Sequence, residues 1–390
     1  MSSQTIQKIS FNVFLLGLVS LLADVSSEMI MPLLPIFILS VGGSGIIIGL
    51  IGGLEEGIAS TFKVIAGYFS DRLGMRKIFL VFGYLIPALS RLFLPFSATW
   101  QQVLALRSAD RTGKGIRTAP RDAIIADCST TECRGRAFGL HRAMDTGGAI
   151  AGSVIAFLCI WFFAMDYSRI FLLAAAVAFL ALLPVAFVKE AKTEPRKRTL
   201  IASISELPKP FRFYLLIAAA FAAGNFTYMF FILRALDLFG RSIAITVLLY
   251  VWFNIIYSMF SLPSGILSDR IGRKKILLVG YSLFGITCML FAVPQSPILL
   301  IILFGLYGLS YAVIEGNQRA FASDFVAQDL RGTALGTFHT IIGFSTFLSG
   351  LIAGVLWDSG HWLSFTYGAL MAFSAVVLLL FLKPERTEAA

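Results

Sequence analysis

The chain has 390 residues, of which 57% are hydrophobic, 13% aromatic and only 14% charged. Soluble domains carry roughly 25% charged residues, so this composition excludes an ordinary soluble protein. The net charge of +10 would suit a nucleic-acid ligand. The basic residues gather in loops on one side of the predicted spans, however, which indicates a membrane protein without a nucleic-acid partner.

Long apolar runs recur from one end of the chain to the other, each about long enough to cross ~30 Å of hydrocarbon. They predict helices, because a lipid-exposed backbone must satisfy its own hydrogen bonds and a barrel would need short alternating segments. The fold class is therefore an all-α membrane protein with twelve transmembrane helices. These cover roughly 11–39, 45–69, 78–96, 100–122, 137–161, 167–188, 211–239, 243–266, 276–294, 297–322, 333–357 and 362–382.

The loop charges predict the orientation of these spans. Twenty of the 32 Lys and Arg residues fall on one side, and only Arg169 and Arg241 lie in loops on the other. This asymmetry places both termini in the cytoplasm. The first apolar run is too long for a signal core and contains Asp24 and Glu28, so we expect a retained helix. The predicted location is the bacterial inner membrane.

The chain contains an internal repeat. The sequence of 67–81, GYFSDRLGMRKIFLV, matches 265–279, GILSDRIGRKKILLV, at an offset of 198, and RGRAFG at 134–139 matches RGTALG at 331–336 at an offset of 197. The repeat predicts two six-helix bundles, 1–188 and 211–390. The basic, proline-containing segment 189–210 is the predicted cytoplasmic linker. Parallel halves of this kind are one plan of secondary transporters.

Two equivalent loops carry the same arrangement of charge and glycine. Glycine allows a tight turn, and an Asp near a helix N-terminus is electrostatically favoured. A single copy would be explained equally well as a basic topogenic loop, but two copies at equivalent places make that explanation weak. The charged residues that the two loops share are Asp71, Arg72 and Arg76 in the first loop and Asp269, Arg270 and Arg273 in the second.

With these loops, the chain resembles the major facilitator superfamily. The two loops are similar to the signature of that family between helices 2 and 3 and between helices 8 and 9. The resemblance covers the whole chain through helix number, duplication and central linker. It implies that Asp71, and by the same reasoning Asp269, helps to hold a cytoplasmic gate shut. The candidate gate residues that follow from the resemblance are Asp71, Arg72, Arg76, Asp269, Arg270 and Arg273.

The fourth predicted helix carries a charged stripe, RSADRTGKGIRTAPRD at 107–122. At 100° per residue its charges fall within an arc of about 120°, with Arg107 roughly 10 Å and Arg111 roughly 16 Å below the outer boundary at Trp100. Unpaired, each would cost at least ~2.5–3.5 kcal/mol against lipid, so the stripe must face a cavity or other protein. Arg111 also matches the arginine of the family's helix 4 motif, whereas Arg117 stands where that family has a small residue.

The first half contains further membrane-depth charges on neighbouring predicted helices, six acids and six bases in all. One interpretation is an ion-pair network that fixes helix packing, and the other is a site for a charged solute or for protons. The sparser, aromatic-rich second half is expected to supply much of an apolar wall. The candidate substrate and proton residues are Asp24, Glu28, Glu56, Arg107, Asp110, Arg111, Lys114, Arg142, Asp145, Asn225 and Glu315.

These expectations favour a secondary active transporter that works by alternating access. The sequence shows no catalytic residue set and no ATP-binding loop. We expect proton coupling and a small solute with an anionic or zwitterionic group, such as an organic acid or a siderophore-like chelate. The protein is expected to act as a monomer among membrane lipids, with no cofactor and no metal. Alternatives are a multidrug or lipophilic-cation exporter, a lipid flippase and a non-transporting receptor.

Three glycines bear on the exporter alternative. Gly139, Gly148 and Gly152 partly resemble an antiporter motif, but they equally suit close helix packing.

Overall fold

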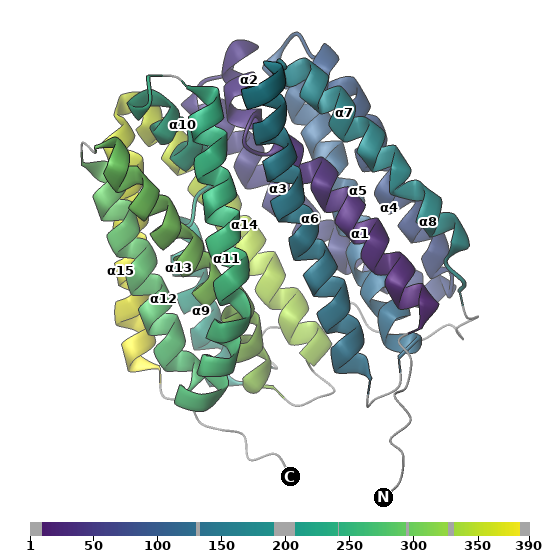
Figure 1. Ribbon diagram of the computed structural model, residues 1–390. Coiled ribbons are helices and arrows are strands. Elements are labelled where there is room, and N and C mark those ends of the chain that lie inside the picture. Colours follow the sequence, from purple (N-terminus) through teal and green to yellow (C-terminus); the bar gives the residue numbers. More distant parts are fainter. Residues whose placement is uncertain are drawn as a thin grey trace, which may run out of the picture. The chain divides into compact units, whose positions relative to one another are not determined.

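The computed structural model describes residues 10–129, 133–190, 207–240, 242–293, 296–326 and 331–382, with only the backbone described at 331–333. Within these ranges the chain is helical and has no strand (Figure 1). The first half contains α1 (Phe11–Ile30), α2 (Leu34–Ser40), α3 (Gly45–Leu73), α4 (Arg76–Phe93), a short 3-10 turn (Leu94–Phe96), α5 (Trp100–Asp127), α6 (Arg134–Phe163), α7 (Tyr167–Leu180) and α8 (Leu182–Phe187).

The second half contains α9 (Lys209–Gly224), α10 (Met229–Leu238), α11 (Ile243–Ile271), α12 (Arg273–Ala292), α13 (Pro297–Asp324), α14 (Arg331–Ser359) and α15 (His361–Phe381). In the described chain, eleven helical stretches are long and apolar enough to cross a membrane. The remaining long helix is α5, whose 28 residues include the charged stripe. The all-α membrane fold class is thereby confirmed.

Three of the predicted spans are not single continuous α-helices in the structure. Two of them, 167–188 and 211–239, each still correspond to one stretch long and apolar enough to cross a membrane. The span predicted at 11–39 breaks between α1 and α2 at Pro32, which has no backbone donor to continue the helix. The span at 167–188 breaks at Ala181, three residues before Pro184. The span at 211–239 breaks between Gly224 and Met229, where Gly and Asn are weak helix formers.

Backbone contacts divide the described chain into two compact units. Unit 1 holds the described residues of Met1–Met31, Phe62–Phe96 and Ala105–Arg198, and unit 2 holds those of Pro32–Thr61, Ser97–Leu104 and Thr199–Ala390. Helices α3 and α5 therefore contribute to both units. The division into repeats at 1–188 and 211–390 remains a prediction. Most of the predicted linker, 191–206, lies outside the described residues.

In unit 1, α1 packs closely along α6, and the two helices lie side by side in Figure 1. A side chain at Gly148 would collide with the backbone of Leu21, and one at Gly152 with the backbone of Val25. Small residues at these positions let the two backbones approach, as is common between membrane helices. Two of the three glycines of the partial antiporter motif are thus explained by packing, whereas nothing lies close to Gly139.

Unit 2 has an aromatic core. Phe231 stacks on Tyr307 with ring centroids 4.0 Å apart and meets Phe291 edge-to-face at 5.0 Å. Phe226 and Phe365 join the same cluster. Such ring pairs add about 0.5–1.5 kcal/mol each beyond the apolar area they bury. The part of α3 in this unit runs along α14, where the backbones of Gly49 and Gly350 meet.

Candidate functional site

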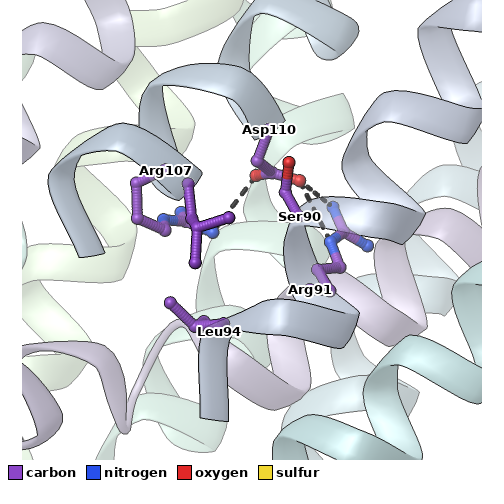
Figure 2. Close-up of a pocket in the computed structure, with 6 residues that line it drawn as sticks. Ser90, Arg91, Leu94, Arg107 and Asp110 are labelled. Carbon is purple, nitrogen blue, oxygen red and sulfur yellow. Dashed lines mark hydrogen bonds and ion pairs between the residues drawn. The ribbon is translucent and has the colours of Figure 1, made fainter. Parts of the chain in front are cut away.

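The charged stripe of α5 begins with a closed ion-pair cluster in unit 1. Asp110 Oδ2 lies 3.1 Å from Arg107 Nη1, and its Oδ1 accepts from Arg91 Nε at 3.1 Å (Figure 2). Exposure is only 1% at Arg107, 2% at Asp110 and 4% at Arg91. The small pocket between these groups cannot hold a water molecule. The ionised side chains are therefore compensated by one another and not by solvent.

Arg91 extends this cluster from α4 to α1. Its Nη1 donates to Ala23 O at 3.1 Å and to Ser26 Oγ at 2.8 Å. Arg111 lies on the other side of Asp110, with Nε 3.8 Å from Oδ2, and its Nη2 contacts Met31 Sδ at 3.2 Å. The cluster ties three helices together. This geometry supports the packing interpretation for Arg107 and Asp110.

Farther along α5, the charged residues of the stripe differ from one another in burial and in partners. Arg117 is buried, with 4% exposure, and its guanidinium carbon lies over the Tyr84 ring, 4.3 Å from the centroid. Arg121 pairs with Asp122 at 3.0 Å and donates to Ser20 Oγ at 3.0 Å. Lys114, in contrast, is exposed. The charged residues of the stripe, predicted to face one environment, therefore face two: Arg117 lies in the protein interior and Lys114 is exposed.

Two acidic candidates meet between α1 and α6. The carboxyl groups of Asp24 and Asp145 hydrogen-bond to each other, and Lys114 and Arg117 lie close enough to act on the charge of Asp24. Arg142 Nη1 lies 3.2 Å from Asp145 Oδ2, with the two side chains 52% and 22% exposed. A hydrogen bond between two carboxyl groups needs a proton on one of them, since an ionised carboxylate only accepts. The structure thus brings together Asp24, Lys114, Arg142 and Asp145.

Glu28 and Glu56 are the remaining acidic candidates of the first half. Glu28 is half-buried one turn after Asp24 on α1 and has partners within the fold. Glu56 is exposed on the part of α3 that belongs to unit 2, next to the buried Glu55.

In unit 2 the candidates Asn225 and Glu315 are linked by tyrosines. Tyr311 OH donates to Asn225 Oδ1 at 3.2 Å, and Tyr257 OH donates to Glu315 Oε2. Glu315 Oε1 pairs with Arg319 Nη2 at 2.9 Å. Neither Tyr257 nor Tyr311 is among the site residues predicted from the sequence. Tyr311, Glu315 and Arg319 are spaced four apart on α13, and this one-face pattern is the signal that could have identified Tyr311. Nothing comparable marks Tyr257 on α11.

The first motif loop forms a compact network in unit 1. Arg76 Nη2 lies 3.3 Å from Asp71 Oδ1, and Arg76 Nη1 pairs with Asp127 at the end of α5. The backbone N–H of Arg76, which begins α4, donates to Glu190 Oε1. Arg72 is exposed and contacts Tyr68 OH at 3.3 Å. Arg76 is thus the centre of the loop, and Asp127 is the partner that the list of gate residues lacked.

The second motif loop forms the same kind of network in unit 2, although its turn is one residue shorter. Arg273 pairs with Asp324 and lies 3.4 Å from Asp269, while Arg270 is exposed. Matching the motifs at an offset of 198 aligns Arg76 with Lys274, but the structure gives Arg76 and Arg273 the same role, at an offset of 197. The turn after α3 contains Gly74 and Met75, whereas only Gly272 separates α11 from α12. Both glycines have positive φ, 66° and 98°, which glycine adopts without strain.

Long apolar helices, paired charges inside several of them and two equivalent motif loops define a multi-pass membrane transporter. A model of the Major Facilitator Superfamily matches residues 16–251 and 214–390. The chain is 46% identical over 383 residues to an uncharacterized MFS-type transporter of Methanocaldococcus jannaschii, covering 96% of each. It is 25% identical over 385 residues to the class E tetracycline resistance protein of Escherichia coli, covering 92% of this chain and 91% of that one.

Solved structures share the fold. A variant of the nucleoside transporter NupG matches with a TM-score of 0.79 at 16% identity, covering 94% of this chain and 99% of that one. A D-xylose–proton symporter matches with a TM-score of 0.78 at 15% identity, covering 98% and 100%. This chain belongs to the Major Facilitator Superfamily.

Proposed function

We propose that this transporter is a proton-coupled secondary active transporter, and that the Asp24–Asp145 pair carries the proton. The observation behind this is the hydrogen bond between two carboxyl groups in half-buried positions. Such a pair holds one proton, and it releases that proton when a positive charge moves closer or when one carboxyl group turns away. Alternating access would expose the pair to the two sides of the membrane in turn. No chemical conversion of the solute is part of this proposal.

The charges around the pair support a solute with an anionic or zwitterionic group. Lys114 and Arg142 are both exposed and both act on this carboxyl pair. When the pair is protonated, one negative charge is lost and these cations are less compensated, which favours an anion in their place. Proton and anion would then be taken up together. The cationic groups of Arg107 and Arg111 serve this site less directly, because the buried Asp110 already pairs with Arg107.

The test is transport by the purified full chain in liposomes. An inward proton gradient should drive uptake of at least one member of a panel of organic acids, zwitterions and siderophore-like chelates, with alkalinisation outside reported by a pH-sensitive dye. Asp24→Asn and Asp145→Asn should abolish gradient-driven accumulation while exchange of solute for solute persists. Asp237→Asn, at an exposed carboxylate of α10, is the control.

Other outcomes would assign a different function. The panel includes tetracycline, because one relative is named for resistance to that drug. It also includes lipophilic cations and fluorescent lipids, which cover the exporter and flippase alternatives. The proposed role of the pair would be overturned if accumulation does not depend on the proton gradient, or if it persists in both Asp24→Asn and Asp145→Asn.

A further inference from the structure

The described part of unit 2 contains a polar and aromatic surface that packing alone does not explain. It is formed by Asn225 at the break between α9 and α10, Tyr257 on α11, and Tyr311, Glu315 and Arg319 on α13. All five side chains are partly exposed. Because its members come from three helices and hydrogen-bond to one another, we refer to them together as the tyrosine surface.

The charged members show that this surface faces water. The side chains of Glu315 and Arg319 are 42% and 41% exposed, although α13 is one of the apolar spans. Glu315 lies nine residues before the end of α13 at Asp324, which is roughly 14 Å along the helix. Half-exposed charges at that depth would be costly against lipid, so they line an aqueous space.

The break in the neighbouring helix supports the same conclusion. Asn225 ends α9 with φ −87° and ψ 70°, and helical structure resumes at Met229. Non-helical backbone at membrane depth is tolerated where it is buried in protein or lines a water-filled cavity, and broken helices of this kind form binding sites in transporters. Asn225 is partly exposed and its amide already holds Tyr311 in place.

A buried aromatic layer supports the two partly exposed tyrosines. Phe253 stacks on Tyr257 with centroids 6.2 Å apart and planes 9° apart, and it meets Tyr311 edge-to-face at 5.7 Å. Tyr307 meets Tyr311 at 5.1 Å. Phe253 and Tyr307 are buried, at 7% and 2% exposure. Fixed rings bind a ligand at a low entropic cost, because little side-chain freedom remains to be lost.

The polar groups are compensated within the surface. Both oxygens of Glu315 have partners, since Arg319 pairs with Oε1 and Tyr257 donates to Oε2. The surface therefore offers aromatic faces bordered by a hydroxyl, an amide and a neutral ion pair, and the exposed carboxylate of Glu56 on α3 lies close enough to act on Tyr311. That combination suits a flat ring with hydroxyl or amine substituents, because the ring stacks and its substituents form hydrogen bonds at the edge.

We propose that the tyrosine surface binds a planar ring with hydroxyl or amine substituents, carried by the transported solute. This inference rests on the proposed transport function and names the class of solute. The second half is then more than the apolar wall expected from the sequence, since it selects for ring shape. Stacking of a flat ring on one aromatic side chain strengthens binding by about 5- to 150-fold in nucleic-acid complexes, which is enough to discriminate solutes.

Binding to the purified full chain provides the test, with thermal stabilisation and equilibrium dialysis as readouts. The probes are 4-hydroxybenzoate, tyrosine, tyramine and cytidine, which cover anionic, zwitterionic, cationic and neutral ring solutes. Each is paired with a partner of equal charge that lacks the planar ring, such as 4-hydroxycyclohexanecarboxylate for 4-hydroxybenzoate. At least one planar probe should bind tenfold or more tightly than its partner.

Variants at one position separate stacking from other effects. Tyr311→Phe keeps the ring and should retain the preference for planar probes, with binding weakened severalfold by loss of the hydrogen bond to Asn225. Tyr311→Leu should reduce that preference to less than twofold. Tyr367→Leu is the matched control: this tyrosine of α15 is also partly exposed in unit 2 and donates to Ala223 O.

The proposal is overturned if no planar probe binds, if the ring-free partners bind equally well, or if Tyr367→Leu has the same effect as Tyr311→Leu. These results are distinct from a failure of proton coupling. A chain that prefers planar probes but does not respond to a proton gradient would contradict the Asp24–Asp145 mechanism only.

Discussion

Asp110 illustrates how burial decides the role of a single charged residue. Its carboxylate lies between the guanidinium groups of Arg91 and Arg107 in a pocket too small for water. Asp122 lies three turns farther along α5, pairs with Arg121, and is 41% exposed. Both aspartates pair with an arginine of the same helix. If the aspartate is replaced, water can reach the arginine of the second pair but not that of the first.

Replacing these two aspartates should therefore have different consequences. Asp110→Asn leaves buried arginine charge undercompensated, which typically costs about 3–5 kcal/mol of unfolding free energy. Asp122→Asn removes an exposed pair and should cost about 0–1 kcal/mol. Thermal unfolding of both variants in detergent micelles checks this. Equal melting temperatures combined with loss of transport in Asp110→Asn alone would instead place Asp110 in the solute site.

Pairs of helices in this protein depend on small residues and on contacts at helix ends. In unit 2, α3 crosses α14 where the backbones of Gly49 and Gly350 meet. At the start of α3, Asp358 on α14 accepts from the N–H of Gly45 at 2.8 Å and from that of Ile46 at 3.1 Å. A carboxylate at a helix N-terminus satisfies free donors and is favoured by the helix dipole. Close backbones and a capped end therefore act together in this pair.

Gly49→Ala should separate this pair of helices. The new Cβ would collide with Gly350 O, so we expect a loss of about 1–3 kcal/mol and a lower melting temperature. Gly57→Ala is the control on the same helix, because its Cβ would have its nearest neighbour, Gly343 O, at an ordinary 3.5 Å. That variant gains up to ~1 kcal/mol of helix propensity and should be neutral or slightly stabilising. An equal loss in both variants would show that the crossing has no such constraint.

At the scale of the whole molecule, duplication and charge asymmetry set the organisation. Arg76 in unit 1 and Arg273 in unit 2 each join a motif-loop aspartate to an aspartate at the end of a later helix. Lys77 Nζ donates to Ala186 O and Lys274 Nζ to Leu382 O, so each network also reaches the last helix of its own half. The repeat thus preserves a set of contacts as well as a sequence motif.

The distribution of basic residues predicts that both termini are cytoplasmic. Green fluorescent protein fused after residue 390 should be fluorescent, and alkaline phosphatase at the same place should be inactive. Fusions after Asp166, the N-cap of α7, should give the opposite result. Phosphatase activity at the C-terminus would mean that the predicted orientation is inverted, and the motif loops would then lie on the outer side.

The sequence by itself determined the helical membrane class, the positions of most spans and the family, because hydropathy and spacing follow from the bilayer and from helix geometry. It also drew attention to Asp24, Asp145, Asn225 and Glu315. What it left open was which charges compensate one another, since periodicity gives the face of a helix but not the residue opposite to it. The six acids and six bases of the first half therefore allowed both interpretations.

Only the tertiary structure decided those partnerships. It joined Arg107 to Asp110 and Arg91 out of water, and Asp24 to Asp145 beside exposed cations. It also gave Arg76 and Arg273 one role despite the shorter second turn, and gathered Tyr257 and Tyr311 beside a broken helix. The physical reason is that the energy of a charge or an aromatic ring in a membrane depends on its neighbours and on its access to water, and folding brings those neighbours from distant parts of the chain.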